Sequence, residues 1–327
     1  MKLAVFTHTY MDRTFGDMLD IIKAKGICSV EIGAGGLIGK SHCDPQRLLS
    51  DENALKSFKE EYEKRGMEIA CLSAHGNPLH PAGDTAKAHD EDIRACIELA
   101  PKLGVKTVVT FSGCPGDNDD ARYPNWVVAP WPPDFQDILE YQWEKKLIPY
   151  WKEVNKLAAD NGVNVALELH GGFCVHSPAT MIRLREEGGL ENVGANIDPS
   201  HLWWQGIDPS MAIRHIGAAG GLFYFHAKDT KIEQRNVDYY GLTDTQSYAN
   251  VRDRAWQFRT IGYGHDLSEW GNMISTLRMM GYDEYISIEH EDAMMSPDEG
   301  LNKAIANIRT VLMEEPAELP AMFSQKG

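Results

Sequence analysis

Acidic and imidazole side chains close four short apolar segments of this chain. They are Glu168, Asp198, His226 and Glu289, at the ends of segments 164–168, 193–198, 222–226 and 285–289. If the fold brings the four together, the carboxylates repel one another and lose hydration unless a cation compensates them. Three oxygen donors and one nitrogen suit Mn²⁺, our first expectation, or Mg²⁺, Co²⁺ or Zn²⁺, and the lack of a thiolate argues against a structural zinc.

The elements that must position these residues are strands covered on both faces. Eight short runs are apolar and rich in β-branched residues, which is typical of a parallel sheet. The eight runs are 3–7, 29–32, 69–73, 107–111, 164–168, 193–198, 222–226 and 285–289. The ends of parallel strands share one face of a barrel, so residues distant in the sequence would meet there.

Segments of helical periodicity separate these runs. They cover residues 15–25, 55–65, 90–103, 138–161 and 268–280, and a glycine follows each, as expected for a helix stop. The alternation predicts a single (β/α)8 TIM barrel, with a doubly wound open sheet as the rival. We expect the barrel to occupy residues 1–313 and a loosely held tail to occupy residues 314–327.

Two connections are longer than the others. Residues 112–136 follow the fourth strand and are rich in Pro, Asp and Trp, and residues 230–265 follow the seventh. Loops of this length are often lids over a functional site, and both follow strand ends where barrels place their active sites. We therefore expect enlarged loops after strands 4 and 7 that act as lids.

Composition limits the classes of partner. The chain has 327 residues, 43% of them hydrophobic, and a formal net charge of −16. Because nucleic-acid binding needs a basic surface, we expect no nucleic-acid partner. The N-terminus MKLAVFTHTYMD has too short an apolar stretch for a secretory signal or a membrane span. Six scattered cysteines indicate reduced thiols. From the N-terminus and the cysteines together we expect a cytoplasmic protein with no membrane partner.

The strand-end motifs resemble a known family. The segments ALELHGG (166–172), NIDPSHLWWQGIDP (196–209), FHAKDT (225–230) and SIEHED (287–292) are similar to those of the xylose-isomerase-like TIM-barrel superfamily of sugar isomerases and epimerases. Its members include ketose 3-epimerases, inosose dehydratases and endonuclease IV. The combination of D-x-x-H at Asp198 and His201 with H-x-K-D after His226 carries most of this resemblance.

The resemblance implies a site and a reaction. It makes Glu168, Asp198, His226 and Glu289 the ligands of one divalent metal ion. It also implies that Glu168 and Glu289 act as base and acid on opposite faces of the carbon next to a carbonyl of a sugar or keto-sugar, through a metal-bound enediolate. The substrate contacts that we expect are His201, Lys228, His75, His170 and His8.

Other outcomes stay open at this point. The epimerases carry a further glutamate after the strand 5 ligand and an arginine after the strand 7 histidine, where this chain has His170 and Cys174, and Lys228 and Lys231. A lyase or dehydratase performing β-elimination on a 3-keto-sugar or 3-keto-glycoside is therefore the main alternative. A non-catalytic sugar-binding or partner subunit is a remote one. The aromatic loops are compatible with a homo-oligomer, a dimer or tetramer.

Overall fold

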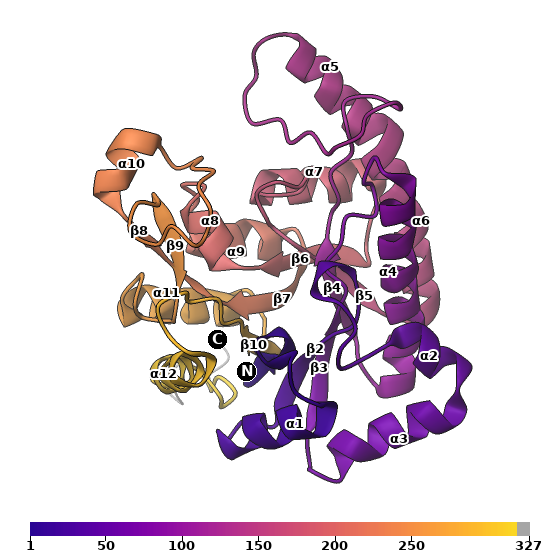
Figure 1. The fold of residues 1–327 in the computed structure, drawn as a ribbon, viewed down its shortest axis with the longest axis vertical. Coiled ribbons are helices and arrows are strands. Elements are labelled where there is room, and N and C mark those ends of the chain that lie inside the picture. The colour runs from indigo at the N-terminus through magenta and orange to yellow at the C-terminus, as the bar shows by residue number, and fades with distance from the viewer. Residues whose placement is uncertain (319–327) are drawn as a thin grey trace, which may run out of the picture.

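Eight parallel strands close into a barrel in the computed structural model, which describes residues 1–318 (Figure 1). The order around the barrel is β1-β10-β7-β6-β5-β4-β3-β2. The strands are β1 (Lys2–Phe6), β2 (Ser29–Gly33), β3 (Glu68–Ser73), β4 (Thr107–Phe111), β5 (Asn164–Glu168), β6 (Val193–Ile197), β7 (Leu222–Ala227) and β10 (Tyr285–Ile288). All eight predicted strands are confirmed. The open sheet is excluded because β1 pairs with both β2 and β10.

Helices surround the barrel and bury the outward side chains of its strands. Every residue of β2, β4 and β6 is buried. This burial explains why apolar and polar residues do not alternate along these strands in the sequence. The helices are α1 (Phe15–Ala24), α2 (Pro45–Ser50), α3 (Glu52–Glu63), α4 (Gly83–Leu103), α5 (Asp134–Glu140), α6 (Ile148–Asn161), α7 (Pro178–Gly188), α8 (Pro199–Trp203), α9 (Pro209–Ala218), α10 (Gln234–Tyr240), α11 (Leu267–Met279) and α12 (Pro297–Arg309). Two short 3-10 helices, η1 (Thr7–Tyr10) and η2 (Gly36–Ile38), follow β1 and β2.

Several helix boundaries differ from the prediction. The helix expected at 90–103 begins at Gly83, and the helix expected at 138–161 consists of α5, a π-helical segment (Tyr141–Leu147) and α6. Gly104 and Gly162 end α4 and α6 in the left-handed conformation, as their place after the periodic segments predicts.

The two long connections have different structures. The connection after β4 is irregular as far as Pro133, and together with α5 it projects from the barrel at the top of Figure 1. The connection after β7 is more than a loop: it holds the antiparallel pair β8 (Asp229–Ile232) and β9 (Trp256–Arg259), and α10. We call residues 229–259 the β7 insertion. Its strands are only four residues long, too short for a clear periodic signal.

The described part of the chain ends shortly after α12. Residues 314–318 of the expected tail have no regular secondary structure, and residues 319–327 lie outside the described residues. Among residues 1–318, no helix has both the length and the apolar character that a bilayer span requires.

Candidate metal centre and active site

The four predicted metal ligands meet at the carboxyl end of the barrel. Glu168 is the last residue of β5, and His226 lies in β7. Asp198 follows β6 as the N-cap residue of α8, and Glu289 follows β10. One potential ligand atom from each side chain lies within 4.8 Å of the other three. Glu168, Asp198 and His226 are buried, and the Glu289 side chain is 9% exposed.

The unpaired atoms of this cluster fit a divalent cation. Asp198 Oδ2, His226 Nδ1 and Glu289 Oε2 are buried and lack a hydrogen-bond partner among the described residues. The Lys228 ammonium group is 3.1 Å from Asp198 Oδ2 and 2.9 Å from Glu289 Oε2, but it does not satisfy hydrogen-bond geometry with either atom. Unpaired polar atoms are costly in a protein interior. Carboxylate and imidazole donors facing one point therefore suggest a divalent metal, whose identity they leave open between Mn²⁺, Mg²⁺, Co²⁺ and Zn²⁺.

Glu31, which the sequence analysis missed, orients the imidazole of this cluster. His226 Nε2 lies 3.0 Å from both carboxylate oxygens of Glu31, and Ser287 and Ser73 donate hydrogen bonds to the same carboxylate. When Nε2 carries the proton that Glu31 accepts, the Nδ1 lone pair faces the cluster. The available signal was a single carboxylate inside the otherwise apolar run 29–32.

Imidazoles surround the Glu168 carboxylate. His75 Nε2 is 2.9 Å from Glu168 Oε2, and His201 Nε2 is 3.1 Å from Oε1. The ring of His170 lies 3.9 Å from the ring of His201. Burial opposes ionisation of Glu168, but the neighbouring imidazoles of His201, His226 and His75 are the stronger influence and hold its pKa well below the usual range. Burial, followed by the charges of His170 and Lys228, lowers the pKa of His201.

Lys228 lies beside several acidic residues of the cluster. This buried ammonium group is 2.9 Å from Glu291 Oε2 in addition to its contacts with Asp198 and Glu289. Although burial opposes the charged form, these carboxylates raise the pKa of Lys228 well above its usual range. Lys228 is therefore a fixed positive charge beside two of the predicted metal ligands.

Asp198 is the acidic residue of the cluster that retains a proton most readily. Burial and the neighbouring Glu168 and Glu289 carboxylates raise its pKa to about 7, although Lys228 acts in the opposite direction. Burial likewise disfavours the Glu289 carboxylate, but Lys228 and His226 hold its pKa well below the usual range.

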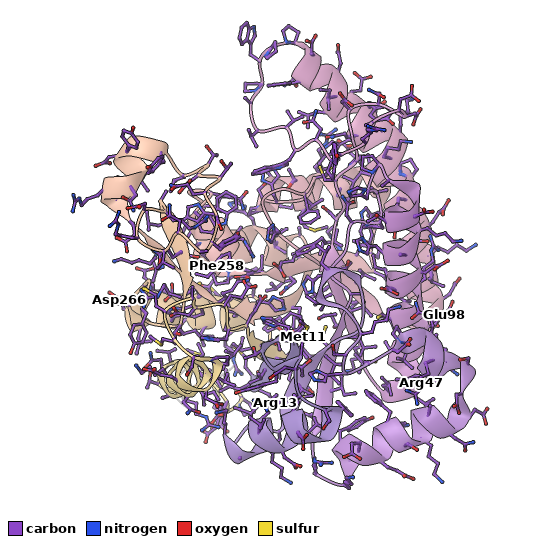
Figure 2. The ribbon with its side chains drawn as sticks, viewed as in Figure 1. Met11, Arg13, Arg47, Glu98, Phe258 and Asp266 are labelled. Atoms are coloured by element: carbon purple, nitrogen blue, oxygen red, sulfur yellow. The ribbon has the colours of Figure 1, made fainter. Side chains whose placement is uncertain are left out.

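A cavity of about 530 Å³ opens onto this cluster. Four of the five predicted substrate contacts line it: His75, His170, His201 and Lys228. His8 is not among the lining residues, although a ring nitrogen of His8 lies within 4.8 Å of oxygens of Glu289 and Glu291. The β7 insertion forms one wall through Tyr248, Val251, Arg254, Gln257 and Phe258, none of which was predicted from the sequence. Figure 2 labels Phe258 on the side of the insertion that faces the barrel.

Two aromatic residues near the site have packing roles. The ring of Trp203 stacks on His265 at 3.7 Å, and the ring of Trp204 stacks on Trp256 at 4.8 Å. His265 in turn lies 3.0 Å from Asp229 through Nδ1. None of these five residues lines the cavity, so we assign them to fixing the β7 insertion against α8.

Comparisons with known proteins place the chain in a family. The family model described as xylose isomerase-like TIM barrel matches residues 19–311. The uncharacterized protein YfiH of Bacillus subtilis (strain 168) is 38% identical over 317 residues, which cover 96% of this chain and 100% of YfiH. The inosose dehydratase of Geobacillus thermodenitrificans (strain NG80-2) is 24% identical over 290 residues, or 86% of this chain and 88% of the relative.

A solved structure confirms the architecture. The 3-keto-D-glucoside 4-epimerase YcjR of E. coli, in its apo form, superimposes with a TM-score of 0.65 at 16% identity, covering 95% of this chain and 99% of YcjR. At this identity the likeness concerns the fold alone. The family match and the barrel agree with the resemblance of the strand-end motifs, and the chain belongs to the xylose isomerase-like TIM barrel family.

Proposed function

We propose that the chain is a divalent-metal-dependent sugar isomerase or epimerase that moves a proton next to a carbonyl of a sugar or keto-sugar. One observation carries this proposal: Glu168 and Glu289 both lie beside His226 Nδ1, at 3.2 Å and 3.1 Å, and both line one cavity. Two carboxylates that flank one reaction centre suit a proton removed on one face and returned on the other.

The ligand set supplies the setting for this transfer. Glu168, Asp198, His226 and Glu289 would hold the cation, which when bound would act as a Lewis acid that makes the proton next to the carbonyl easier to remove. His75 and His201 fix the Glu168 carboxylate, and Glu31 fixes the His226 ring. These contacts preorganise the site before the substrate arrives.

The remaining side chains would handle charge and water. Lys228 is placed to stabilise negative charge that develops on a substrate oxygen, because its ammonium group already faces the ligand carboxylates. Phe6, Phe111, Phe173 and Phe258 form apolar walls that would limit water access to the reacting carbon. A small-molecule substrate fits a cavity of this size.

A β-elimination is the second candidate, and the imidazoles favour it. His75, His170 and His201 line the cavity beside Glu168, so one of them could protonate a leaving hydroxyl or alkoxide after Glu168 or Glu289 removes the proton. The relative from Geobacillus thermodenitrificans is named an inosose dehydratase. Both reactions begin with the same proton abstraction. They differ only in whether a leaving group then departs from the substrate.

The test is an isotope experiment in D2O with the metal-loaded protein. Ketohexoses, inososes and 3-keto-glucosides are followed by NMR for deuterium next to the carbonyl and by mass spectrometry for loss of water or an aglycone. We expect exchange with at least one of these compounds and a loss of at least 100-fold in both Glu168→Gln and Glu289→Gln. A product whose mass equals that of the substrate plus the incorporated deuterium indicates epimerisation or isomerisation. A product that has lost water or an aglycone indicates elimination.

A surface variant controls for general damage. Glu98→Gln changes an exposed carboxylate of α4 on the outside of the molecule (Figure 2) and should leave the exchange unchanged. Exchange that persists in both active-site variants would overturn the proposal.

A further inference from the structure

The β7 insertion contains a buried guanidinium without an acidic partner. Arg254 is 2% exposed, and among residues 1–318 no carboxylate oxygen lies within the 4.0 Å of an ion pair with it. Its Nε donates to the backbone oxygen of Trp256 at 3.1 Å, and Nη1 donates to the backbone oxygen of Gln246. The other terminal nitrogen, Nη2, makes no hydrogen bond within the described part of the chain.

Aromatic rings hold this guanidinium at the wall of the cavity. Its central carbon lies 4.3 Å from the ring centre of Tyr248 and 4.5 Å from that of Trp256. Arg254 lines the same cavity as Glu168 and Glu289. Asp244, an acidic residue of the same insertion, is occupied elsewhere because its oxygens accept from the backbone nitrogens of Ala255 and Gln246. Arg254 therefore presents to the cavity a positive charge that forms no ion pair with a carboxylate of the described residues.

Arg254 lies farther from the metal centre than Lys228. The Lys228 ammonium group is 4.7 Å from the ring centre of Phe258, the ring of Tyr248 stacks on Phe258 at 5.6 Å, and Arg254 lies over Tyr248. Phe258 and Tyr248 thus form a chain of contacts between the two cations. Lys228 lies beside the proposed ligands Asp198 and Glu289, whereas Arg254 forms an ion pair with neither of them.

The cavity has room for a substituent in addition to a sugar ring. Its volume of about 530 Å³ is typical of sites for drug-sized ligands, which are larger than a single sugar ring. Near Arg254 the lining includes Val251 and Tyr248, and Leu37 and Ile38 of η2 contribute further apolar surface. This outer part suits an apolar or planar group, and its charged contact suits an anion.

We propose that Arg254 forms an anion subsite that binds an acidic group on the substituent of the keto-sugar substrate. The inference rests on the proposed function, since it takes the sugar carbonyl to lie at the metal centre. A guanidinium recognises a carboxylate or a phosphate through the same paired donors, and burial strengthens that contact. A bound anion would also neutralise a charge that is costly to bury alone.

The test compares small anions with a neutral molecule of the same shape. Binding of benzoate, phenyl phosphate and benzamide to the metal-loaded protein is measured by isothermal titration calorimetry. We expect benzoate or phenyl phosphate to bind at least tenfold more tightly than benzamide, and the stronger of the two identifies the acid. Arg254→Met should remove this preference and leave benzamide binding unchanged. Arg252→Met, which changes a guanidinium whose side chain is 89% exposed in the same insertion, should preserve it.

Three results would overturn the anion subsite. The wild-type protein would bind the three compounds equally, Arg254→Met would keep the preference, or Arg252→Met would lose it as fully as Arg254→Met. Any of these results would leave Arg254 with the role of holding the insertion through Gln246 and Trp256. Because Arg254→Met removes those two hydrogen bonds, retained benzamide binding reports an intact cavity. The variant is needed because Lys228 is a second cation in the same cavity.

The readout separates this inference from the proposed function. Glu168→Gln should abolish isotope exchange and keep the anion preference, since no hydrogen bond or ion pair joins Glu168 to Arg254. Isotope exchange without anion preference would refute the subsite alone. Anion preference without exchange would refute the proposed reaction alone.

Discussion

Two of the proposed ligands, Asp198 and His226, share a local design in which one side-chain atom is anchored by a hydrogen bond and another has none. Asp198 Oδ1 accepts the backbone N–H of Ser200 at 2.8 Å, and Oδ2 is left free. His226 Nε2 is held by Glu31, and Nδ1 is left free. Anchoring of this kind fixes ligand direction before a metal arrives and raises metal affinity.

Glu31→Gln tests the anchoring of His226. The neutral amide is a weaker acceptor for the Nε2 proton, so we expect Mn²⁺ affinity to fall by about 10- to 100-fold while the barrel stays folded. Calorimetric titration of the metal-free protein with Mn²⁺ measures this change. Glu68→Gln is the control because Glu68 begins the adjacent strand and contacts Lys2 and Ser29 instead. Equal affinity in the wild type and Glu31→Gln would contradict the role of Glu31.

At the level of elements, one carboxylate fastens the β7 insertion to the barrel. Asp229 is fully buried at the start of β8, and its oxygens accept the backbone N–H groups of Gly262, Gly264 and His265 at 2.9 to 3.1 Å. Asp229 thus joins the beginning of the insertion to the segment that follows its end. The walls formed by Phe258 and Arg254 depend on this closure.

Asp229→Asn should loosen the insertion. An amide cannot accept all of these hydrogen bonds, and leaving buried donors unpaired costs roughly 2 to 4 kcal/mol in the free energy of unfolding. Urea denaturation measures the loss. Asp238→Asn, an exposed residue of α10 that accepts from Gln234, should change stability by less than about 0.5 kcal/mol. Similar stability of both variants would show that Asp229 does not fasten the insertion.

The sequence predicted the elements and the strand-end residues because both follow from local pattern. Apolar runs gave all eight strands, and Glu168, Asp198, His226 and Glu289 stand at or beside their ends. Glu31 and Arg254 were missed for physical reasons. The role of Glu31 depends on contacts with residues far away in the chain. Arg254 lies in an insertion whose strands are too short for a periodic signal. His226 is 195 residues from Glu31 in sequence. No local spacing encodes such a contact.

For the whole molecule, the acidic excess has a local counterpart. The chain carries 48 acidic and 32 basic residues, and four of the acidic ones, Glu31, Glu168, Asp198 and Glu289, meet inside the barrel. The connection after β4 exposes Tyr123, Val128 and Trp131, which are apolar or aromatic side chains that could contact another subunit. A homo-oligomer therefore stays a prediction. The absence of a nucleic-acid partner and the cytoplasmic location also stay predictions.

Stability should depend on pH and metal together. The raised pKa of Asp198, about 7 against 3.8 for the ordinary group, stabilises the metal-free fold below pH 4, and this contribution is lost as the pH rises through 7. A metal needs the ionised form, which is about tenfold scarcer at pH 6 than at pH 8. We therefore expect Mn²⁺ to raise the melting temperature more at pH 8 than at pH 6, by differential scanning calorimetry. Equal increases at both pH values would contradict this coupling.

The central claim is that Glu168, Asp198, His226 and Glu289 form one divalent metal centre. Its most direct test is calorimetric titration of chelator-stripped protein with Mn²⁺ and Zn²⁺, for the wild type, Asp198→Asn and the exposed control Asp160→Asn. The account predicts one ion per chain, at least 100-fold weaker binding in Asp198→Asn and unchanged binding in Asp160→Asn. Absence of binding to the wild type, or equal affinity in Asp198→Asn, would contradict it.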